Sequence, residues 1–364
     1  MTFAAHVVSA PPRHVALSRN LDRNRRLLAG WLFLLAGMIL VMVGLGGATR
    51  LTGSGLSIMR WAPLIGAVPP LSHAAWEHLY ALYRSIPQYD LLHQGFGLAG
   101  FQGIFWLEWV HRLWGRLIGL AVIVPLAIFF FQGRISRWLA ARLLLFFVLG
   151  GVQGLIGWLM VASGFRPDST SVAAPWLVLH LVFALALYAA VLWTALTLYS
   201  PEPPALPGTR PLFRLSLAAC VLVAFTIAAG GLTAGTHAGF VYNTFPLMEG
   251  HIVPGNYARL HPFFANFVHN LATVQFNHRL LASLTLLVIL TTTLLAFANR
   301  RRLSRAALLA IAALGFDVLL QYALGVTTLL LVVPIPVAIA HLLNATLLLT
   351  ASLVALSTLR GALQ

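Results

Sequence analysis

The sequence predicts an all-α polytopic membrane protein, with eight transmembrane helices arranged as two pseudo-twofold-related four-helix bundles. Of its 364 residues, 60% are hydrophobic and only 9% are charged, against about 25% charged in an ordinary soluble domain. Apolar stretches also recur at the length of roughly 20 residues that crosses a bilayer as a helix. The eight predicted spans are residues 27–48, 117–131, 143–163, 177–199, 215–234, 280–298, 306–333 and 337–359.

The basic residues predict the orientation of these spans. The net charge is +15, and the arginines cluster in residues 1–26, 134–142, 210–214, 300–305 and at Arg360. With eight spans, all these segments lie on one side of the membrane, as the positive-inside rule requires. We therefore expect both termini in the cytoplasm of a cell with this protein in its inner membrane, or in the matrix for a mitochondrial inner membrane. Because the charge is dispersed, it predicts no nucleic-acid partner.

An internal repeat divides the chain into two halves. The segment around His111, LEWVHRL, resembles VQFNHRL around His278, and His180 corresponds to His341. We place a cytoplasmic tail at 1–26, a first half at 27–200, a linker at 201–211 and a second half at 212–360. The linker contains five prolines and a glycine, which are incompatible with a continuous helix.

Two long connections, residues 51–103 and 235–270, follow the first span of each half. They are aromatic and semi-apolar, which favours lids on the outer membrane face with short interfacial helices. Plain connections without a role are the alternative. The single cysteine, Cys220, excludes an intrachain disulfide and a thiolate metal cluster.

Four histidines are predicted at one depth, because His111, His180, His278 and His341 each lie near the outer start of an even-numbered span. Ionisable groups inside a membrane are costly and are usually functional. Carboxylate-rich metal sites are disfavoured because the chain has only eight acidic residues. Two facing imidazoles suit the axial positions of a heme, although a tetrahedral four-histidine centre stays open. Glycines that either admit a flat macrocycle or allow tight helix packing are Gly115, Gly119, Gly150, Gly151, Gly154 and Gly157.

Arginines near the same face are candidate partners for the propionates of a heme. They are Arg50, Arg112, Arg116 and Arg279. Arginine pairs with carboxylates through two parallel hydrogen bonds. The alternative is that these side chains reach to lipid headgroups.

The two halves differ beside their first histidine. Glu108 precedes His111 by three residues, whereas Gln275 precedes His278 by three. Positions i and i+3 share a helix face, so each side chain lies beside the histidine of its half. A carboxylate can accept a proton or stabilise positive charge, whereas an amide cannot act as a base. The first half is thus predicted to be catalytic, with Glu108 as its proton acceptor or electrostatic stabiliser. The alternative is that Glu108 only hydrogen-bonds an imidazole or an arginine.

The chain resembles the heme A synthase family, in the proteobacterial and mitochondrial branch that lacks paired loop cysteines. The similarity extends, in order, over most of the sequence. Its segments are GGATRLTGSGLS at 46–57, PQY at 87–89, IFWLEWVHR at 104–112 with Gly115 and Arg116, YNTFPLM at 242–248, and VQFNHR at 274–279. Gln102 and His269 depart from the family pattern, which has a lysine and a glutamate there.

The resemblance implies oxidation of the C8 methyl group of heme O to a formyl group, making heme A for aa3-type oxidases. It implies that His278 and His341 hold a heme B cofactor, that His111 and His180 flank the substrate heme, and that Glu108 is needed for turnover. Implied partners are heme O, membrane lipid, heme O synthase and cytochrome oxidase assembly factors.

Two other functions fit parts of the sequence. A di-heme b-type membrane cytochrome that takes electrons from quinol accounts for four histidines, but not for the difference between Glu108 and Gln275. A transporter of parallel repeats would use the histidines as a proton relay. The sequence does not decide between a monomer and a homo-oligomer.

Overall fold

The computed structural model describes residues 13–363 except 64, 168, 202 and 203, with side chains from residue 22 onward. Among these residues, eight helices are long and apolar enough to cross a membrane, and no strand is formed. The predicted membrane class and its eight spans are confirmed. The spans are α1 (Arg13–Leu51), α4 (Leu98–Phe131), α5 (Arg137–Ser163), α6 (Ala174–Tyr199), α7 (Arg210–Gly235), α9 (Leu271–Ala298), α10 (Arg305–Leu330) and α11 (Ile335–Thr358).

Local sequence signals start most of these helices. The side chains of Ser136, Asn270 and Ser304 accept hydrogen bonds from backbone amides in the first turns of α5, α9 and α10, which satisfies donors that have no intrahelical partner. Proline occupies the first turn of α6, α7 and α11, where its missing N–H costs nothing. Six of the eight spans thus begin at a capping side chain or at a proline.

The spans begin before their predicted apolar runs, and two of them begin more than ten residues earlier. Helix α1 starts at Arg13 and α4 at Leu98, whereas the apolar runs start at 27 and 117. Between Arg13 and residue 27 there is neither proline nor glycine, and arginine and leucine are good helix formers, so the helix continues beyond the apolar segment. Of the predicted tail at 1–26, residues 1–12 lie outside the described residues.

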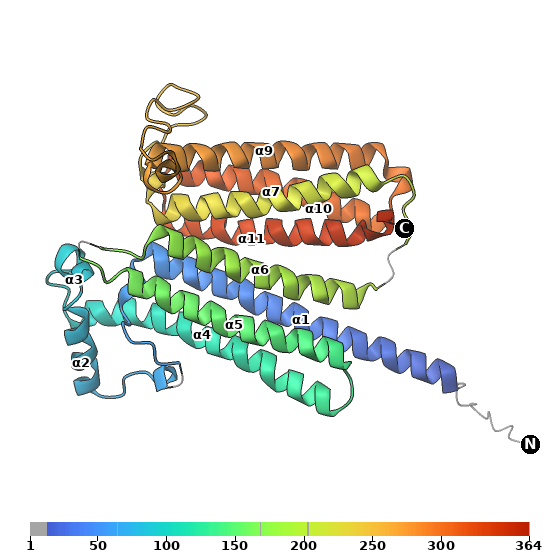
Figure 1. The fold of residues 1–364 in the computed structure, drawn as a ribbon, viewed down its shortest axis with the longest axis horizontal. Coiled ribbons are helices and arrows are strands. Elements are labelled where there is room, and N and C mark those ends of the chain that lie inside the picture. The colour runs from blue at the N-terminus through green and yellow to red at the C-terminus, as the bar shows by residue number, and fades with distance from the viewer. Residues whose placement is uncertain (1–12, 64, 168, 202–203, 364) are drawn as a thin grey trace, which may run out of the picture.

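The spans form two rings of four helices (Figure 1). In the first ring α1 contacts α4 and α6, and α5 closes the ring between them; in the second, α7 contacts α9 and α11, and α10 closes it. The rings meet where α6 contacts α7 and α11, and α1 contacts α11. Corresponding helices thus make corresponding contacts, although the twofold axis and the boundaries at 27–200 and 212–360 stay predictions.

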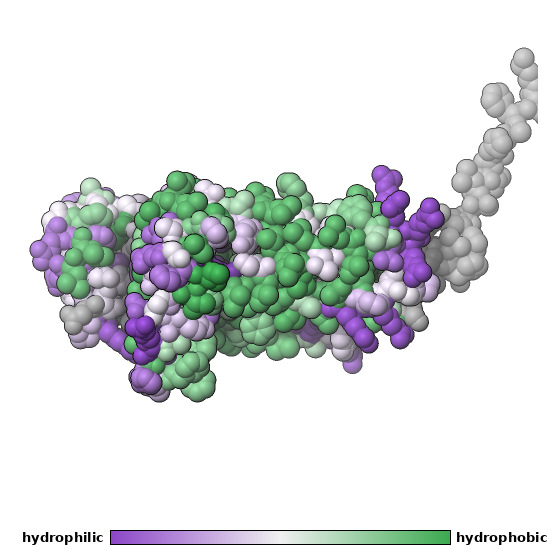
Figure 2. Space-filling model, turned by 90° about the horizontal axis from the view of Figure 1, so that it is seen from above, coloured by the Kyte–Doolittle hydropathy of each residue, from purple (hydrophilic) through white to green (hydrophobic). Residues whose placement is uncertain are grey.

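The surface of the protein has an apolar middle and polar ends. Figure 2 shows a wide hydrophobic belt with hydrophilic residues gathered at either end. One end, here called the arginine end, carries the clustered arginines between α4 and α5 and between α9 and α10. The other, the lid end, carries the two long connections (left in Figure 1). A belt of this kind is what a bilayer requires of a helical protein.

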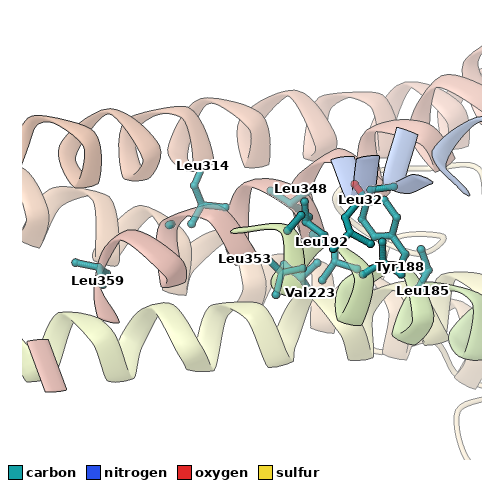
Figure 3. Packing of buried hydrophobic residues seen from close by; sticks show 14 of the residues in the cluster. Leu32, Leu185, Tyr188, Leu192, Val223, Leu314, Leu348, Leu353 and Leu359 are labelled. Atoms are coloured by element: carbon teal, nitrogen blue, oxygen red, sulfur yellow. The ribbon is translucent and has the colours of Figure 1, made fainter. Parts of the chain in front are cut away.

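The core lies between the two rings and inside each of them. Leu32, Val223, Leu314 and Leu359 are at most 1% exposed and belong to one continuous cluster (Figure 3). Close helix contact requires small residues at some positions, because a Cβ at Gly235 of α7 would lie 2.8 Å from the Cβ of Ala174 on α6. Packing of small residues is the usual means of helix association in membranes.

Both lids contain short helices, as predicted. The first holds η1 (Ser54–Leu56), η2 (Ile65–Ala67), α2 (His73–Tyr83) and α3 (Pro87–Leu92); the second holds η3 (Ala238–Phe240), η4 (Phe263–Ala265) and α8 (Asn266–His269). Ile65 and Phe264 are 85% and 79% exposed. Such exposed apolar side chains suit segments that rest against a membrane surface.

Candidate active site

The four predicted histidines lie in the first half of their helices, near the lid end. His111 is on α4, His180 on α6, His278 on α9 and His341 on α11. In each ring these helices stand at opposite corners, because each contacts the two other members of its ring. His111 and His180 are close enough for charges on their rings to interact, and so are His278 and His341. The structure therefore brings the histidines together as two pairs, each across the interior of one ring.

A glycine on a neighbouring helix makes room for each imidazole. In the first ring, a Cβ at Gly46 would lie 3.3 Å from the imidazole of His111, and a Cβ at Gly157 would lie 2.8 Å from that of His180. In the second ring, a Cβ at Gly230 would lie 2.9 Å from the imidazole of His278, and a Cβ at Gly325 would lie 2.9 Å from that of His341. Contacts below 3.0 Å are not tolerated by rigid neighbours. Of the predicted glycines only Gly157 has this role; Gly150, Gly151 and Gly154 have no heavy atom within 4 Å of their Cβ positions, so no neighbouring helix packs closely against them.

The ring nitrogens are compatible with ligation of iron. Nδ1 of His278 lies 3.2 Å from the carbonyl oxygen of Thr226, and donation to that oxygen leaves Nε2 with a free lone pair. Nδ1 of His341 is buried without a hydrogen-bond partner among the described residues. In the first ring, Nε2 of Gln153 lies 3.1 Å from Nδ1 of His180. No group of three or more His, Cys, Asp or Glu side chains placed to share a metal ion occurs in the described chain, which argues against a single four-histidine centre.

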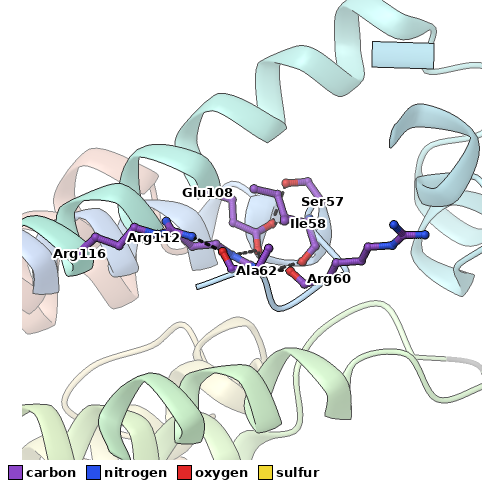
Figure 4. Close-up of polar contacts among 7 residues, drawn as sticks. All are labelled: Ser57, Ile58, Arg60, Ala62, Glu108, Arg112 and Arg116. Carbon is purple, nitrogen blue, oxygen red and sulfur yellow. Dashed lines mark hydrogen bonds and ion pairs between the residues drawn. The ribbon is translucent and has the colours of Figure 1, made fainter. Parts of the chain in front are cut away.

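Glu108 is buried and tied to the first lid. Its side chain is 3% exposed. Oε2 accepts hydrogen bonds from the Ser57 hydroxyl at 2.7 Å and the Ile58 amide at 2.9 Å, and Oε1 accepts two from Arg112 (Figure 4). Four donated hydrogen bonds thus hold the carboxyl group in one position. The predicted alternative, a bond from Glu108 to an arginine, is therefore present, and it does not remove the capacity of this carboxylate to accept a proton.

Gln275 occupies the matching place in the second ring. Its Nε2 donates to the carbonyl oxygens of Ala238 at 2.8 Å and Tyr242 at 3.3 Å, and its Oε1 accepts from Arg279 at 3.1 Å. Both side chains thus join a span to the lid of their own half. The amide does so mainly by donating and the carboxylate only by accepting, so the difference predicted between the halves extends to the lid contacts.

Three of the four predicted arginines bind lid carbonyls, and three of the four keep unused donors. Arg112 donates to Ile58 and Arg60, Arg116 to Ala62 and Pro63, and Arg279 to Tyr242 and Thr244 (Figure 4 shows the first lid). Within the described residues, buried N–H groups without a partner remain on Arg116, Arg279 and Arg50. These free donors are available to a carboxylate, whereas headgroup contact alone leaves the lid bonds unexplained.

One contact that the sequence did not predict joins the two rings at the lid end. Nη2 of Arg50 lies 2.9 Å from Nε2 of His237 and donates to the carbonyl oxygen of Ala234 at 2.9 Å. Burial, and then the positive charge of Arg50, lower the pKa of His237, so that its neutral ring accepts the hydrogen bond. His237 also has a left-handed backbone, with φ 59°. That conformation is uncommon for a residue other than glycine, and Gly53 has it at the same place in the first lid, with φ 69°.

The internal repeat also contains the other site residues that were not predicted, namely Gln153 and, apart from Gly157, the glycines beside the histidines. The echo of GGAT at 46–49 in GGLT at 230–233 contains Gly46 and Gly230. A further echo, Gln153 with Gly157 and Gln321 with Gly325, keeps the same spacing of four residues in α5 and α10. Ser57 could not be inferred, because its contact with Glu108 depends on the path of the lid.

Comparison with known proteins decides the family. The model of a family described as cytochrome oxidase assembly protein matches residues 29–353. The chain is 58% identical to a protein of Granulibacter bethesdensis named heme A synthase, over 94% of this chain and 89% of that one. The chain belongs to the heme A synthase family. Other members that it resembles are heme A synthase 2 of Acidiphilium cryptum, at 47% identity over 93% of both chains, and heme A synthase of Nitrosomonas eutropha, at 43% over 93% and 95%.

Membership in the heme A synthase family makes this chain an oxidoreductase that acts on heme, in the context of cytochrome oxidase assembly, and the site residues fit a heme. Each ring supplies two buried imidazoles from opposite helices, with a glycine behind each of them. His341 offers an unpartnered ring nitrogen, and the arginines at the lid end offer unpartnered N–H groups. These are the ligands and the carboxylate partners that a heme with two propionates requires.

Proposed function

We propose that the protein oxidises the C8 methyl group of heme O to the formyl group of heme A. The observation that carries this proposal is the asymmetry of two otherwise matching rings. Each ring has a histidine pair, but only the first has a buried carboxylate next to its first histidine, in Glu108. The names of the relatives support the same product, since all of those described above are heme A synthases.

In this proposal the first ring binds the substrate and the second holds a resident heme B. His111 and His180 would flank heme O from opposite helices of this ring. His278 and His341 would hold heme B, which supplies one-electron redox chemistry when bound. A bis-histidine site needs no carboxylate, which agrees with a glutamine at position 275.

Glu108 would accept a proton released from the methyl carbon or stabilise the positive charge that develops there. Converting a methyl group to a formyl group is a four-electron oxidation of that carbon by an external oxidant, in which two hydrogens are lost and one oxygen atom is gained from water or dioxygen. A base or a negative charge beside the carbon assists the loss of its protons. The hydrogen bonds from Ser57, Ile58 and Arg112 hold the carboxylate in one position. Fixed charges of this kind are effective because no reorganisation is needed during the reaction.

The free N–H groups of Arg50, Arg116 and Arg279 would bind heme propionates at the lid end. Arg112 is more fully used, since it donates to Glu108 and to two lid carbonyls, and a propionate there would share these donors. Lid bonds and propionate bonds on the same arginines would then order the lids around bound heme.

We further propose that the arginine end faces the cytoplasm in the inner membrane of a bacterial cell. Arginines in the connections from α4 to α5 and from α9 to α10, and in the first turns of α5, α7 and α10, support this orientation. The lid end, with both histidine pairs, then lies near the outer face. Heme O reaching the first ring would come from heme O synthase in the same membrane, and the product would pass to cytochrome oxidase assembly factors.

Glu108→Gln tests the proposed function. The variant keeps the size of the side chain and reproduces the amide found at position 275, but it lacks the base. Cells that depend on the variant should accumulate heme O or partly oxidised heme, identified by extraction and mass spectrometry, with heme binding retained. Glu77→Gln, at a carboxylate 51% exposed on α2, is the control and should yield heme A. Normal heme A from Glu108→Gln would refute the role of this residue, and a di-heme cytochrome that oxidises quinol would become the better interpretation.

A further inference from the structure

The two lids are attached to their rings by the same hydrogen bonds at corresponding positions. Nη2 of Arg112 donates to the carbonyl oxygen of Ile58 and Nη1 to that of Arg60; Nη2 of Arg279 donates to Tyr242 and Nη1 to Thr244. The accepting residues are 184 positions apart in both cases (242 − 58 and 244 − 60). This spacing therefore aligns the lid residues of the two halves one by one.

Within this alignment, two neighbouring positions differ together. Glu108 is replaced by Gln275, and Ser57, which contacts Glu108, aligns with Val241. Ser57 is 1% exposed, whereas Val241 is 42% exposed. The first lid therefore buries a hydroxyl group against the carboxylate (Figure 4), and the second has no hydroxyl at the corresponding place. The hydroxyl occurs in the half that has the acid.

Among the four donors to Glu108, the Ser57 hydroxyl has a property that the others lack. The Ile58 amide and the Arg112 guanidinium can only donate, whereas a hydroxyl group can donate or accept by rotating about its C–O bond. When Glu108 is ionised, Ser57 donates to Oε2. When Oε2 carries a proton, this O–H group can donate a hydrogen bond to the Ser57 oxygen over the same distance. Without this acceptor, the protonated carboxyl group would be a buried donor with no hydrogen-bond partner, which costs free energy.

We propose that Ser57 is a positioning residue that keeps the Glu108 carboxyl group fixed in both of its protonation states. This inference rests on the proposed role of Glu108 as a proton acceptor. Ser57 does not contact the substrate in this account; it acts through Oε2 of Glu108. The other groups that face Glu108 are Arg112 from the same helix and Tyr83 from α2, whose pKa is raised by burial and then by the negative charge of Glu108. Arg112 can only donate, and the Tyr83 hydroxyl is engaged with Oε1 of Gln88 and Nδ1 of His93 instead of with Glu108.

The test compares Ser57→Ala with Ser57→Thr, which restores a hydroxyl, and with Ser54→Ala as a matched control. Ser54 belongs to the same lid and is also 1% exposed, but its hydroxyl pairs with Thr52 at 2.7 Å. Ser57→Ala should lower the rate of heme A formation about tenfold, as expected for one hydrogen bond to a charged group. Because the ionised carboxylate loses a donor, the acid limb of the pH–rate profile should move about one unit to higher pH. Ser57→Thr should recover both properties, and Ser54→Ala should leave the profile in place.

Infrared spectroscopy supplies a readout that does not depend on turnover. The carbonyl band of protonated Glu108, identified by its loss in Glu108→Gln, should shift to higher frequency in Ser57→Ala and stay in place in Ser57→Thr. Should Ser57→Ala not fold, Ser57→Cys, with a weaker donor and acceptor, should give a smaller shift of the same sign. An unchanged band and an unchanged acid limb in Ser57→Ala would overturn the inference. If Glu108→Gln makes heme A, the proposed function itself has failed; if only the Ser57 variants behave like the wild type, the proposed function stands without this inference.

Discussion

Arg112 and Glu108 lie one turn apart on α4, and the guanidinium donates to the same carboxylate oxygen from Nη2 at 2.6 Å and from Nε at 3.1 Å. The pair is largely buried, with 19% and 3% of the side chains exposed. A buried charge that loses its partner is strongly destabilising. This ion pair therefore links the position of the candidate base to the stability of the first ring and its lid.

Arg112→Ala should destabilise the protein by about 3 kcal/mol, because Glu108 would remain as an uncompensated buried charge. Arg279→Ala is the matched control, since Arg279 makes the same lid bonds but faces the neutral Gln275. It should cost about 1–2 kcal/mol. Thermal unfolding of both variants in detergent measures the difference. Equal losses would show that the charge of Glu108 adds nothing to the attachment of the lid.

Gly230→Ala and Gly325→Ala should each displace a histidine of the second ring. The added Cβ would lie 2.9 Å from the ring of His278 or His341, and rigid helices cannot absorb such an overlap without a shift. The ratio of bound heme to purified protein, read from its absorbance, should fall in both variants. Gly37→Ala on α1, where no atom lies within 4 Å of the Cβ position, should retain heme. Full heme content in all three variants would contradict the role assigned to these glycines.

Acidification should weaken the contact between Arg50 and His237. Burial and the charge of Arg50 lower the pKa of His237 in the folded protein, so the stabilisation is fully present above the ordinary value of about 6.5. It is lost as the pH falls below that value toward the lowered pKa. Unfolding measured between pH 8 and pH 5 should show stability falling with pH, less steeply in His237→Gln than in the wild type. His73→Gln, on the exposed face of α2, should keep the wild-type slope.

The sequence predicted the architecture well, because membrane spans depend on local composition. Apolar runs and arginine clusters located all eight spans, and the position of His111, His180, His278 and His341 in their spans placed them near one end. The errors at α1 and α4 have different causes. Helix α1 continues beyond its apolar segment because no proline or glycine stops it. In α4 the apolar run is interrupted in the sequence by Glu108, Arg112 and Arg116, which nevertheless lie inside the helix.

What could not be predicted depends on contacts between distant segments. The sequence indicated that Arg112 and Arg279 lie near the lid end, but not that lid carbonyls occupy them. It placed Glu108 on the face of His111, but the partner on the opposite side, Ser57, comes from a loop 51 residues away. The bond between Arg50 and His237 crosses from one half to the other over 187 residues, and no local pattern encodes it.

The measurement that tests the central claim most directly is the absorbance and mass analysis of hemes bound to His278→Ala, His341→Ala, His111→Ala and His180→Ala. The account assigns one heme to each ring, with heme B in the second. The first two variants should lose heme B, whereas the last two should keep it and lose bound heme O and heme A. Retention of the complete wild-type spectrum by His278→Ala and His341→Ala would contradict the assignment of the two rings.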